Sequence, residues 1–120
     1  MTKIMIIDDQ PLLAKWLTND LEDEGYHISW MVNTDNIKED IRTFMPDIIL
    51  FDIYLNGFER WDILERIKWE RPHLPVLIVS FFDTFISDPH CAKADGYIIK
   101  DIYMDKLRNK MVELLNSNID

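Results

Sequence analysis

Two adjacent carboxylates, Asp8 and Asp9, directly follow the apolar run 4–7 in the stretch "IMIIDDQP". Two unit charges about 4 Å apart repel each other by roughly 4 kcal/mol at an effective dielectric constant of about 20. A buried run should not end on two like charges unless another group offsets their repulsion. Clustered carboxylate oxygens suit a hard divalent cation such as Mg²⁺. This pair is therefore the first candidate for a functional site.

Three further polar residues follow later apolar runs: Asp52 after "DIILF", Ser80 at the end of "VLIVS" and Lys100 after "GYII". A single aspartate after a strand is usually a helix cap or a turn former, and a single serine or lysine there says even less. Their joint occurrence is harder to explain by folding alone. If these runs are neighbouring parallel strands, the residues meet at one edge of the sheet, where open α/β sheets bind their ligands.

The alternation of elements along the chain would bring these residues together. Five short apolar runs, "KIMII", "HISWMV", "DIILF", "VLIVS" and "YIIK", are separated by segments with helical spacing. The spacing predicts helices over 11–24, from "NTDN" to the residue before Pro46, over 58–70, and along the stripe of Met104, Leu107, Met111 and Leu114. The runs "IILF" and "LIV" are solidly apolar, as strands buried on both faces are. The pattern predicts an α/β fold with a doubly wound, five-stranded parallel sheet covered by helices on both faces.

Residues 82–94 are an exception to this alternation. They contain Pro89 and lack convincing helical periodicity. Because proline removes a backbone donor and disrupts a helix interior, we expect the fourth helix to be short or distorted.

Composition limits the class of protein. The 120 residues carry a net charge of −9, which argues against direct nucleic-acid binding because no basic stripe is present to neutralise phosphates. The single cysteine, Cys91, suits a reducing compartment. No stretch approaches the roughly 20 apolar residues that span a bilayer, and there is no signal-peptide pattern. We therefore expect one cytoplasmic domain without a membrane segment.

The segments "IIDDQ", "ILFDI", "VLIVS" and "GYIIKD" together resemble the receiver domain of bacterial two-component response regulators, in order and at suitable spacings. The resemblance covers essentially the whole chain, so residues 1–120 are expected to form one receiver (phosphoacceptor) domain. It implies the CheY-like, flavodoxin-like strand order 2-1-3-4-5.

The resemblance also implies a role for each candidate residue. Asp9, Asp52 and the backbone carbonyl of Tyr54 would bind Mg²⁺, and Asp8 would orient a metal-bound water. Asp52 would be the nucleophile that accepts a phosphoryl group from a histidine kinase or a phosphotransfer protein. Lys100 and Mg²⁺ would supply positive charge around the transferring oxygens.

The same resemblance implies a conformational switch. Ser80 would hydrogen-bond the phosphoryl group, and Tyr97, three residues before Lys100, would swing inward as the second switch residue. The output would reach a partner, a homodimer or an effector domain C-terminal to Asp120. The polar tail "NSNID" fits either a natural end or the start of a linker.

Several positions depart from the family pattern. Asp101 stands where the family has a proline, so we predict a trans peptide bond after Lys100. Asn56 also replaces a proline, and Gly57 is expected to supply the turn because Arg60 occupies the usual glycine position. The unusual fourth helix predicts a partner surface unlike the commonest one in the family.

Two large aromatic residues are expected beside the nucleophile. Phe81 stands where a small residue is common, and its ring is predicted to slow both phosphorylation by small donors and loss of the phosphoryl group. Tyr54, two residues after Asp52, is a second candidate to shield the site from water.

Three alternative functions require other features of the sequence or a different use of this site. A degenerate receiver could act as a phosphorylation-independent interaction module. An aspartate-nucleophile phosphatase would need an acidic residue two positions after the nucleophile, where this chain has Tyr54. A nucleotide-binding fold would need a glycine-rich loop, but the chain has three dispersed glycines. We therefore expect a signalling domain that catalyses its own phosphotransfer and dephosphorylation and no other reaction.

Overall fold

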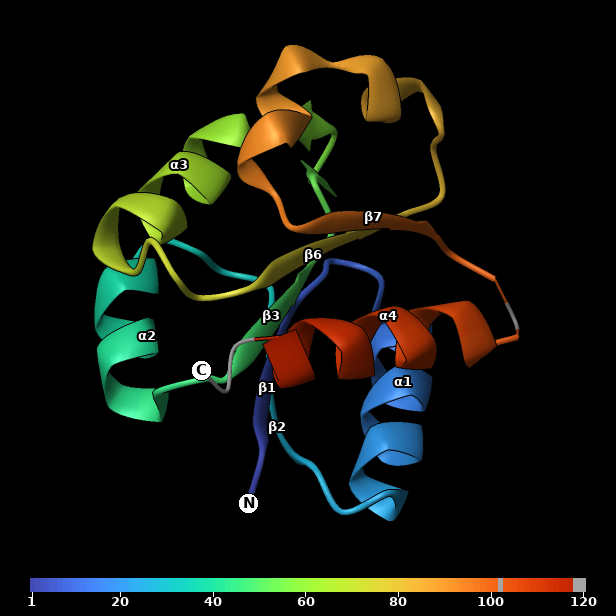
Figure 1. Ribbon diagram of the computed structural model, residues 1–120. Helices are drawn as coiled ribbons and strands as arrows, with labels where there is room; N and C mark the ends of the chain where they lie inside the picture. The colour runs from blue at the N-terminus through green and yellow to red at the C-terminus, as the bar shows by residue number, and fades with distance from the viewer. Residues whose placement is uncertain (102, 118–120) are drawn as a thin grey trace.

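The fold is built on five parallel strands in one sheet. A computed structural model describes residues 1–101 and 103–117. The sheet strands are β1 (Lys3–Ile7), β2 (His27–Met31), β3 (Ile48–Phe51), β6 (Val76–Ser80) and β7 (Gly96–Ile99). They lie in the order β2-β1-β3-β6-β7 (Figure 1). Counted along the chain, this is the order 2-1-3-4-5, so the predicted fold is confirmed.

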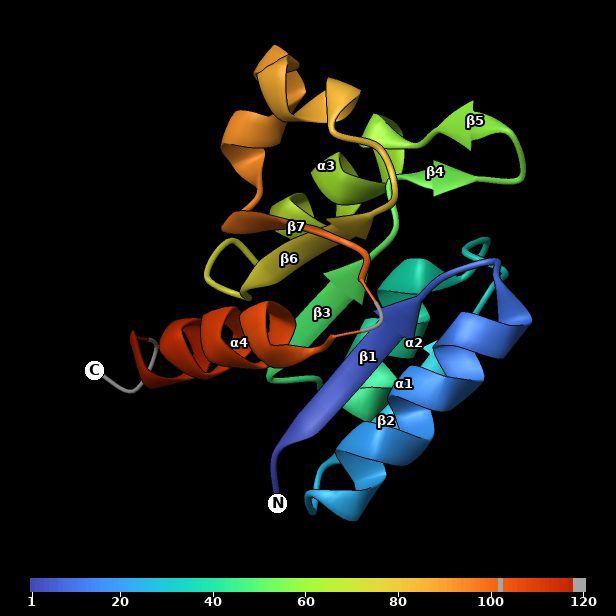
Figure 2. The same ribbon diagram turned by 90° about the vertical axis from the view of Figure 1, so that its right-hand side faces the viewer.

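Helices cover both faces of the sheet. They are α1 (Pro11–Asp23), α2 (Ile37–Phe44), α3 (Trp61–Glu70) and α4 (Asp105–Ser117). The buried side of α2 and α3 packs with Met5 and Ile7 of β1 in one apolar cluster, the α2–α3 apolar cluster. The buried side of α1 and α4 packs with Ile4 and Ile6 in a second cluster. Successive residues of β1 thus serve opposite faces, as the two-residue period of a strand requires, and Figure 2 shows the two helix layers.

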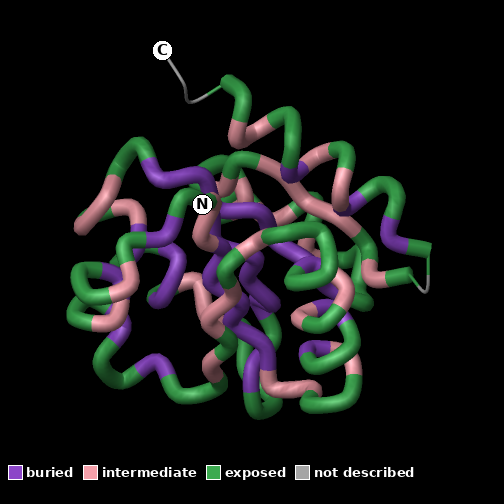
Figure 3. The backbone as a smooth tube through the Cα atoms, turned by 90° about the horizontal axis from the view of Figure 1, so that it is seen from below, coloured by how far each residue is buried: buried purple, intermediate pink, exposed green. Residues whose placement is uncertain are grey.

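The middle of the sheet is the most deeply buried part of the molecule. Every residue of β3 and β6 is buried, whereas edge strands β2 and β7 have no fully buried residue. In Figure 3 the buried parts of the chain lie along the centre. The carboxyl ends of β1, β3 and β6 therefore emerge from a rigid, water-excluding core.

Two short 3₁₀ helices, η1 (Thr84–Ser87) and η2 (Pro89–Lys93), stand in place of a regular fourth helix. Asp88 accepts a hydrogen bond from the backbone N–H of His90, which caps η2 at Pro89. The predicted short or distorted helix is confirmed.

One boundary was wrong: a helix was predicted from residue 58, but α3 begins at Trp61. Residues 54–59 instead form a hairpin of β4 (Tyr54–Leu55) and β5 (Phe58–Glu59). Asn56 and Gly57 at its turn have φ values of 52° and 84°. Asn-Gly is a residue pair that two-residue hairpin turns with positive φ favour. The hairpin therefore forms where the first residues of the helix were predicted, and α3 begins after it.

Peptide-bond geometry and helix length were both predicted, and both can be compared with the described residues. None of their peptide bonds is cis, so the bond between Lys100 and Asp101 is trans. Within 1–101 and 103–117, no helix is both long and apolar enough to cross a bilayer. Residues 118–120 of the polar tail lie outside the described part of the chain.

Candidate phosphoacceptor site

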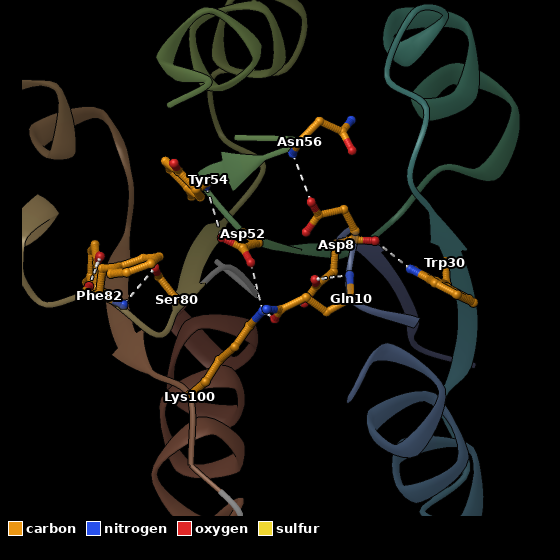
Figure 4. A network of polar contacts seen from close by, with 11 residues as sticks. Asp8, Gln10, Trp30, Asp52, Tyr54, Asn56, Ser80, Phe82 and Lys100 are labelled. Atoms are coloured by element: carbon orange, nitrogen blue, oxygen red, sulfur yellow. Dashed lines mark hydrogen bonds and ion pairs between the residues drawn. The ribbon is translucent and has the colours of Figure 1, made fainter. Parts of the chain in front are cut away.

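The candidate residues meet at the carboxyl-terminal edge of the sheet. Asp8 follows β1, Asp52 follows β3, Ser80 ends β6 and Lys100 follows β7. Asp8 and Asp52 are each 5% exposed, and Ser80 is completely buried. Figure 4 shows their side chains converging from separate strands. Parallel strands explain this convergence, because their ends share one edge.

Lys100 is the electrostatic centre of the group. Its Nζ lies 2.7 Å from Asp52 Oδ2, 2.8 Å from Asp8 Oδ2 and 2.6 Å from Gln10 Oε1. An ammonium group has three N–H donors, so these three acceptors match its full capacity. The side chain of Lys100 is 8% exposed, which places this charge where water screens it weakly.

Three carboxylates form a donor set that suits a divalent cation. Asp8, Asp9 and Asp52 each offer an oxygen atom within 4.8 Å of the other two. Against the single positive charge of Lys100, three carboxylates leave two uncompensated negative charges. Mg²⁺ takes oxygen ligands at about 2.0–2.1 Å and commonly binds one or two carboxylates directly. Both the chemistry and the charge of the cluster therefore fit Mg²⁺.

Burial disfavours the charged form of Asp52. It raises the pKa of the Asp52 carboxyl, and the negative charge of Asp8 acts in the same direction. The hydrogen bond and the charge of Lys100 oppose this rise, as does the backbone N–H of Tyr54, which lies 3.0 Å from Asp52 Oδ1. The Asp52 carboxylate is thus held in a site where the three carboxylates outnumber the one ammonium group of Lys100.

Three residues that the sequence did not indicate, Gln10, Trp30 and Asn56, support the site through four hydrogen bonds. The carboxamide of Gln10 accepts from Lys100, and the Gln10 backbone N–H donates to Asp8 Oδ1 over 2.9 Å. The indole Nε1–H of Trp30 donates to the Asp8 carbonyl oxygen over 2.9 Å. The backbone N–H of Asn56 donates to Asp9 Oδ2 over 2.8 Å. The position of Gln10 beside the aspartate pair was the one available sequence signal.

The two proposed switch residues are joined through Phe82. Ser80 Oγ accepts a hydrogen bond of 3.1 Å from the Phe82 N–H, and the Tyr97 hydroxyl donates to the Phe82 carbonyl oxygen. The Tyr97 ring is half-buried and packs against the α2–α3 apolar cluster. Burial raises the pKa of its phenol, so the hydroxyl stays protonated near neutral pH and acts as a donor.

Aromatic rings line two sides of the site. The centroid of the Phe81 ring lies 4.9 Å from Lys100 Nζ, in a cation–π contact. Tyr54 makes an edge contact with Phe82 at 5.3 Å and a stacked contact with Phe85 at 6.0 Å. These contacts attach the β4–β5 hairpin to the segment that follows β6.

Comparisons with known proteins agree with this geometry. The chain is 26% identical over 115 residues to the probable transcriptional regulatory protein TcrX of Mycobacterium tuberculosis. The matched region covers 93% of this chain and 49% of TcrX. The crystal structure of a CheY-like response regulator receiver domain protein from Methanospirillum hungatei JF-1 is similar with a TM-score of 0.88 and 26% identity, over 98% of this chain and 96% of that one.

A third similarity concerns the fold alone. The response regulator TrrA of Thermotoga maritima, solved in complex with Mg²⁺-BeF, matches with a TM-score of 0.87 and 24% identity over 95% of this chain and 99% of TrrA. TrrA has also been solved in complex with the histidine kinase ThkA.

The family model describing the response regulator receiver domain matches residues 4–112 of this chain. The chain spans about half the length of TcrX. The strand order, the polar residues at the sheet edge and this match lead to one conclusion: the chain belongs to the response regulator receiver domain family.

Proposed function

We propose that this receiver domain accepts a phosphoryl group on Asp52 from a histidine kinase or a phosphotransfer protein, and that Mg²⁺ is required. The observation that carries the proposal is the buried ion pair of Asp52 with Lys100, 2.7 Å apart, beside the acidic cluster of Asp8 and Asp9. The TrrA–ThkA complex supports the kinase as the class of partner.

In the proposed transfer, an Asp52 carboxylate oxygen forms a bond to phosphorus as the bond between phosphorus and the donor imidazole nitrogen breaks. The bonding electron pair stays on that nitrogen, and a proton then neutralises it. Lys100 donates to the phosphoryl oxygens, where fixed positive charge stabilises the transition state. Asp9, Asp52 and the Tyr54 carbonyl would hold Mg²⁺, with Asp8 orienting a bound water. Mg²⁺ would neutralise charge on the transferring group.

The proposed output is a local electrostatic switch. A phosphoryl group adds roughly −1.5 to −2 charges beside Ser80 and Lys100. The Ser80 hydroxyl, which now accepts from the Phe82 N–H, would turn to donate to a phosphoryl oxygen. Because Phe82 also holds the Tyr97 hydroxyl, this change would be transmitted to the ring of Tyr97 and to η1.

We also propose the setting in which the domain acts. Residues 1–120 would form one receiver domain in the cytoplasm that catalyses its own phosphotransfer and dephosphorylation. Control of transcription would require an effector domain or a partner, because the chain spans about half of TcrX and its net charge is −9. Dimerisation and a partner surface around η1 and η2 stay predictions.

The test is intact-mass spectrometry of the protein incubated with a small acyl phosphate or phosphoramidate. With Mg²⁺, we expect one added phosphoryl group that alkaline hydroxylamine removes, as it removes acyl phosphates. A chelator should prevent the addition. An unmodified mass under all conditions, with Mg²⁺ binding intact, would favour the phosphorylation-independent interaction module.

Phe81 is predicted to limit access to Asp52. Its ring is 47% exposed and rests on the Lys100 ammonium group, so Phe81→Ala should open a path for small donors and for water. We expect both the phosphorylation rate and the rate of phosphoryl loss to rise several-fold. Trp69→Ala is the control, because it removes a ring that is 82% exposed on α3. Unchanged rates in Phe81→Ala would rule out a shielding role for this ring.

A further inference from the structure

The β4–β5 hairpin contacts the acidic cluster through its own backbone. Its turn residue Asn56 donates a backbone N–H to Asp9 Oδ2 over 2.8 Å, drawn as the dashed line from Asn56 in Figure 4. The family pattern has a proline at this position, and proline has no N–H to donate. The contact is therefore available to this chain because of its departure from the pattern.

The conformation of the turn sets the direction of the Asn56 N–H. Asn56 and Gly57 both have positive φ, a conformation that asparagine and glycine adopt more readily than other residues. Behind the turn, the Arg60 N–H donates to the Ile53 carbonyl oxygen over 2.8 Å and closes the base of the hairpin. The direction of the Asn56 N–H thus follows from the two-residue turn.

The hairpin is also held from its other side. The Tyr54 ring packs against Phe82 and Phe85, and the buried Leu55 side chain belongs to the α2–α3 apolar cluster. Contacts of both its residues hold β4 beside the sheet edge, and the turn that follows β4 lies against Asp9.

We infer that the Asn56–Gly57 hairpin is a positioning element for the metal site of this receiver domain, an inference that rests on the proposed function. One oxygen of Asp9 is committed to the Asn56 N–H, which leaves the other oxygen for the cation. The carbonyl of Tyr54, also expected to bind Mg²⁺, belongs to β4 of the same hairpin. The hairpin therefore sets two of the expected ligands before Mg²⁺ arrives, and it raises the affinity for Mg²⁺.

Gly57→Ala tests this inference. A Cβ at Gly57 meets no atom within 4 Å, so the substitution acts through the strain of positive φ alone. Alanine disfavours positive φ, so the turn should relax in the metal-free protein, and Mg²⁺ binding must then restore the strained conformation. We expect calorimetric titration to show roughly tenfold weaker Mg²⁺ binding.

Gly25→Ala is the matched control. Gly25 also has positive φ and open space around its Cβ position, but it lies in the turn after α1, at the other end of that helix from Asp8 and Asp9. It should cost similar stability and leave Mg²⁺ affinity unchanged. Equal affinities of the wild type and Gly57→Ala would overturn the inference and leave the proposed function standing. Absence of Mg²⁺ binding in the wild type would overturn both.

A second measurement examines the contact without metal. In metal-free protein, the Asn56 amide should exchange slowly with solvent for a turn residue, and Asp9→Ala should speed its exchange at least several-fold. The amides of Tyr54 and Arg60, which do not donate to Asp9, should keep their rates if the hairpin stays folded. An Asn56 amide that exchanges equally fast in both proteins would also overturn the inference.

Discussion

Replacing Asp52 with asparagine is expected to abolish phosphoryl incorporation and to stabilise the metal-free fold. The amide cannot act as the nucleophile, so the mass of the protein should stay unchanged with a phosphodonor and Mg²⁺. Stabilisation follows because the wild-type carboxylate is 5% exposed beside the negative charge of Asp8. The asparagine removes that charge while its carbonyl oxygen can still accept from Lys100. We expect a gain of about 1 kcal/mol, which raises the midpoint of thermal unfolding by several degrees.

The pH dependence of this gain has a definite sign. Burial and Asp8 raise the pKa of Asp52 above its ordinary value of 3.8, so the folded protein binds this proton more tightly than the unfolded chain does. The contribution of Asp52 to the free energy of unfolding is therefore most favourable below its pKa in the unfolded chain. It decreases as the pH rises through the pKa of Asp52 in the folded protein. Urea denaturation at about pH 4 and about pH 7 should give the free energy of unfolding of both proteins. The stability advantage of the asparagine variant over the wild type should be larger at the higher pH. A variant less stable at both values would contradict the assigned charge balance.

Lys100→Met is expected to lower the phosphorylation rate by about 10²–10³-fold, the usual cost of removing one fixed stabiliser of transition-state charge. The same change leaves Asp8 and Asp52 buried without their shared cation. Removing one partner of a buried ion pair costs about 3 kcal/mol or more. The metal-free variant should therefore unfold at lower urea concentration than the wild type.

Mg²⁺ should partly rescue the stability of Lys100→Met without restoring its reaction. The cation replaces the missing positive charge, so the variant should bind Mg²⁺ more tightly and gain more stability from it than the wild type does. Lys68→Met is a control, because Lys68 pairs with Asp95 through a 2.6 Å contact away from this site. Weaker Mg²⁺ binding by Lys100→Met would mean that Lys100 does not compete with the cation for the same carboxylates.

Much of the fold follows from apolar patterning. The runs that became β3 and β6 are apolar throughout because helices cover both faces of the sheet. The parallel arrangement then places Asp8, Asp52 and Ser80 at one edge. The prediction of a helix from residue 58 is wrong for two reasons. The strands of the hairpin are two residues long, which is too short to show a period of two. The Asn-Gly turn also outweighs the helical spacing of the apolar residues.

The supporting contacts of the site could not be predicted in this way. Gln10 and Lys100 are 90 residues apart, and Trp30 is 22 residues from Asp8. Whether such side chains meet depends on packing, which one-dimensional periodicity does not specify. The Asn56 contact is made by a backbone N–H, which every residue except proline carries, so the type of residue 56 does not identify Asp9 as its acceptor. Residues of the sheet edge are thus predictable by position, whereas their hydrogen-bond partners are not.

The most direct measurement is to identify the residue that carries phosphorus. Borohydride reduces an aspartyl phosphate to homoserine, so the protein should be treated with a phosphodonor, reduced, digested and analysed by peptide mass spectrometry. We predict homoserine at position 52 when Mg²⁺ is present and none when a chelator replaces it. Homoserine at another aspartate, or equal labelling of residue 52 with and without Mg²⁺, would contradict a metal-assisted phosphoacceptor at the end of β3.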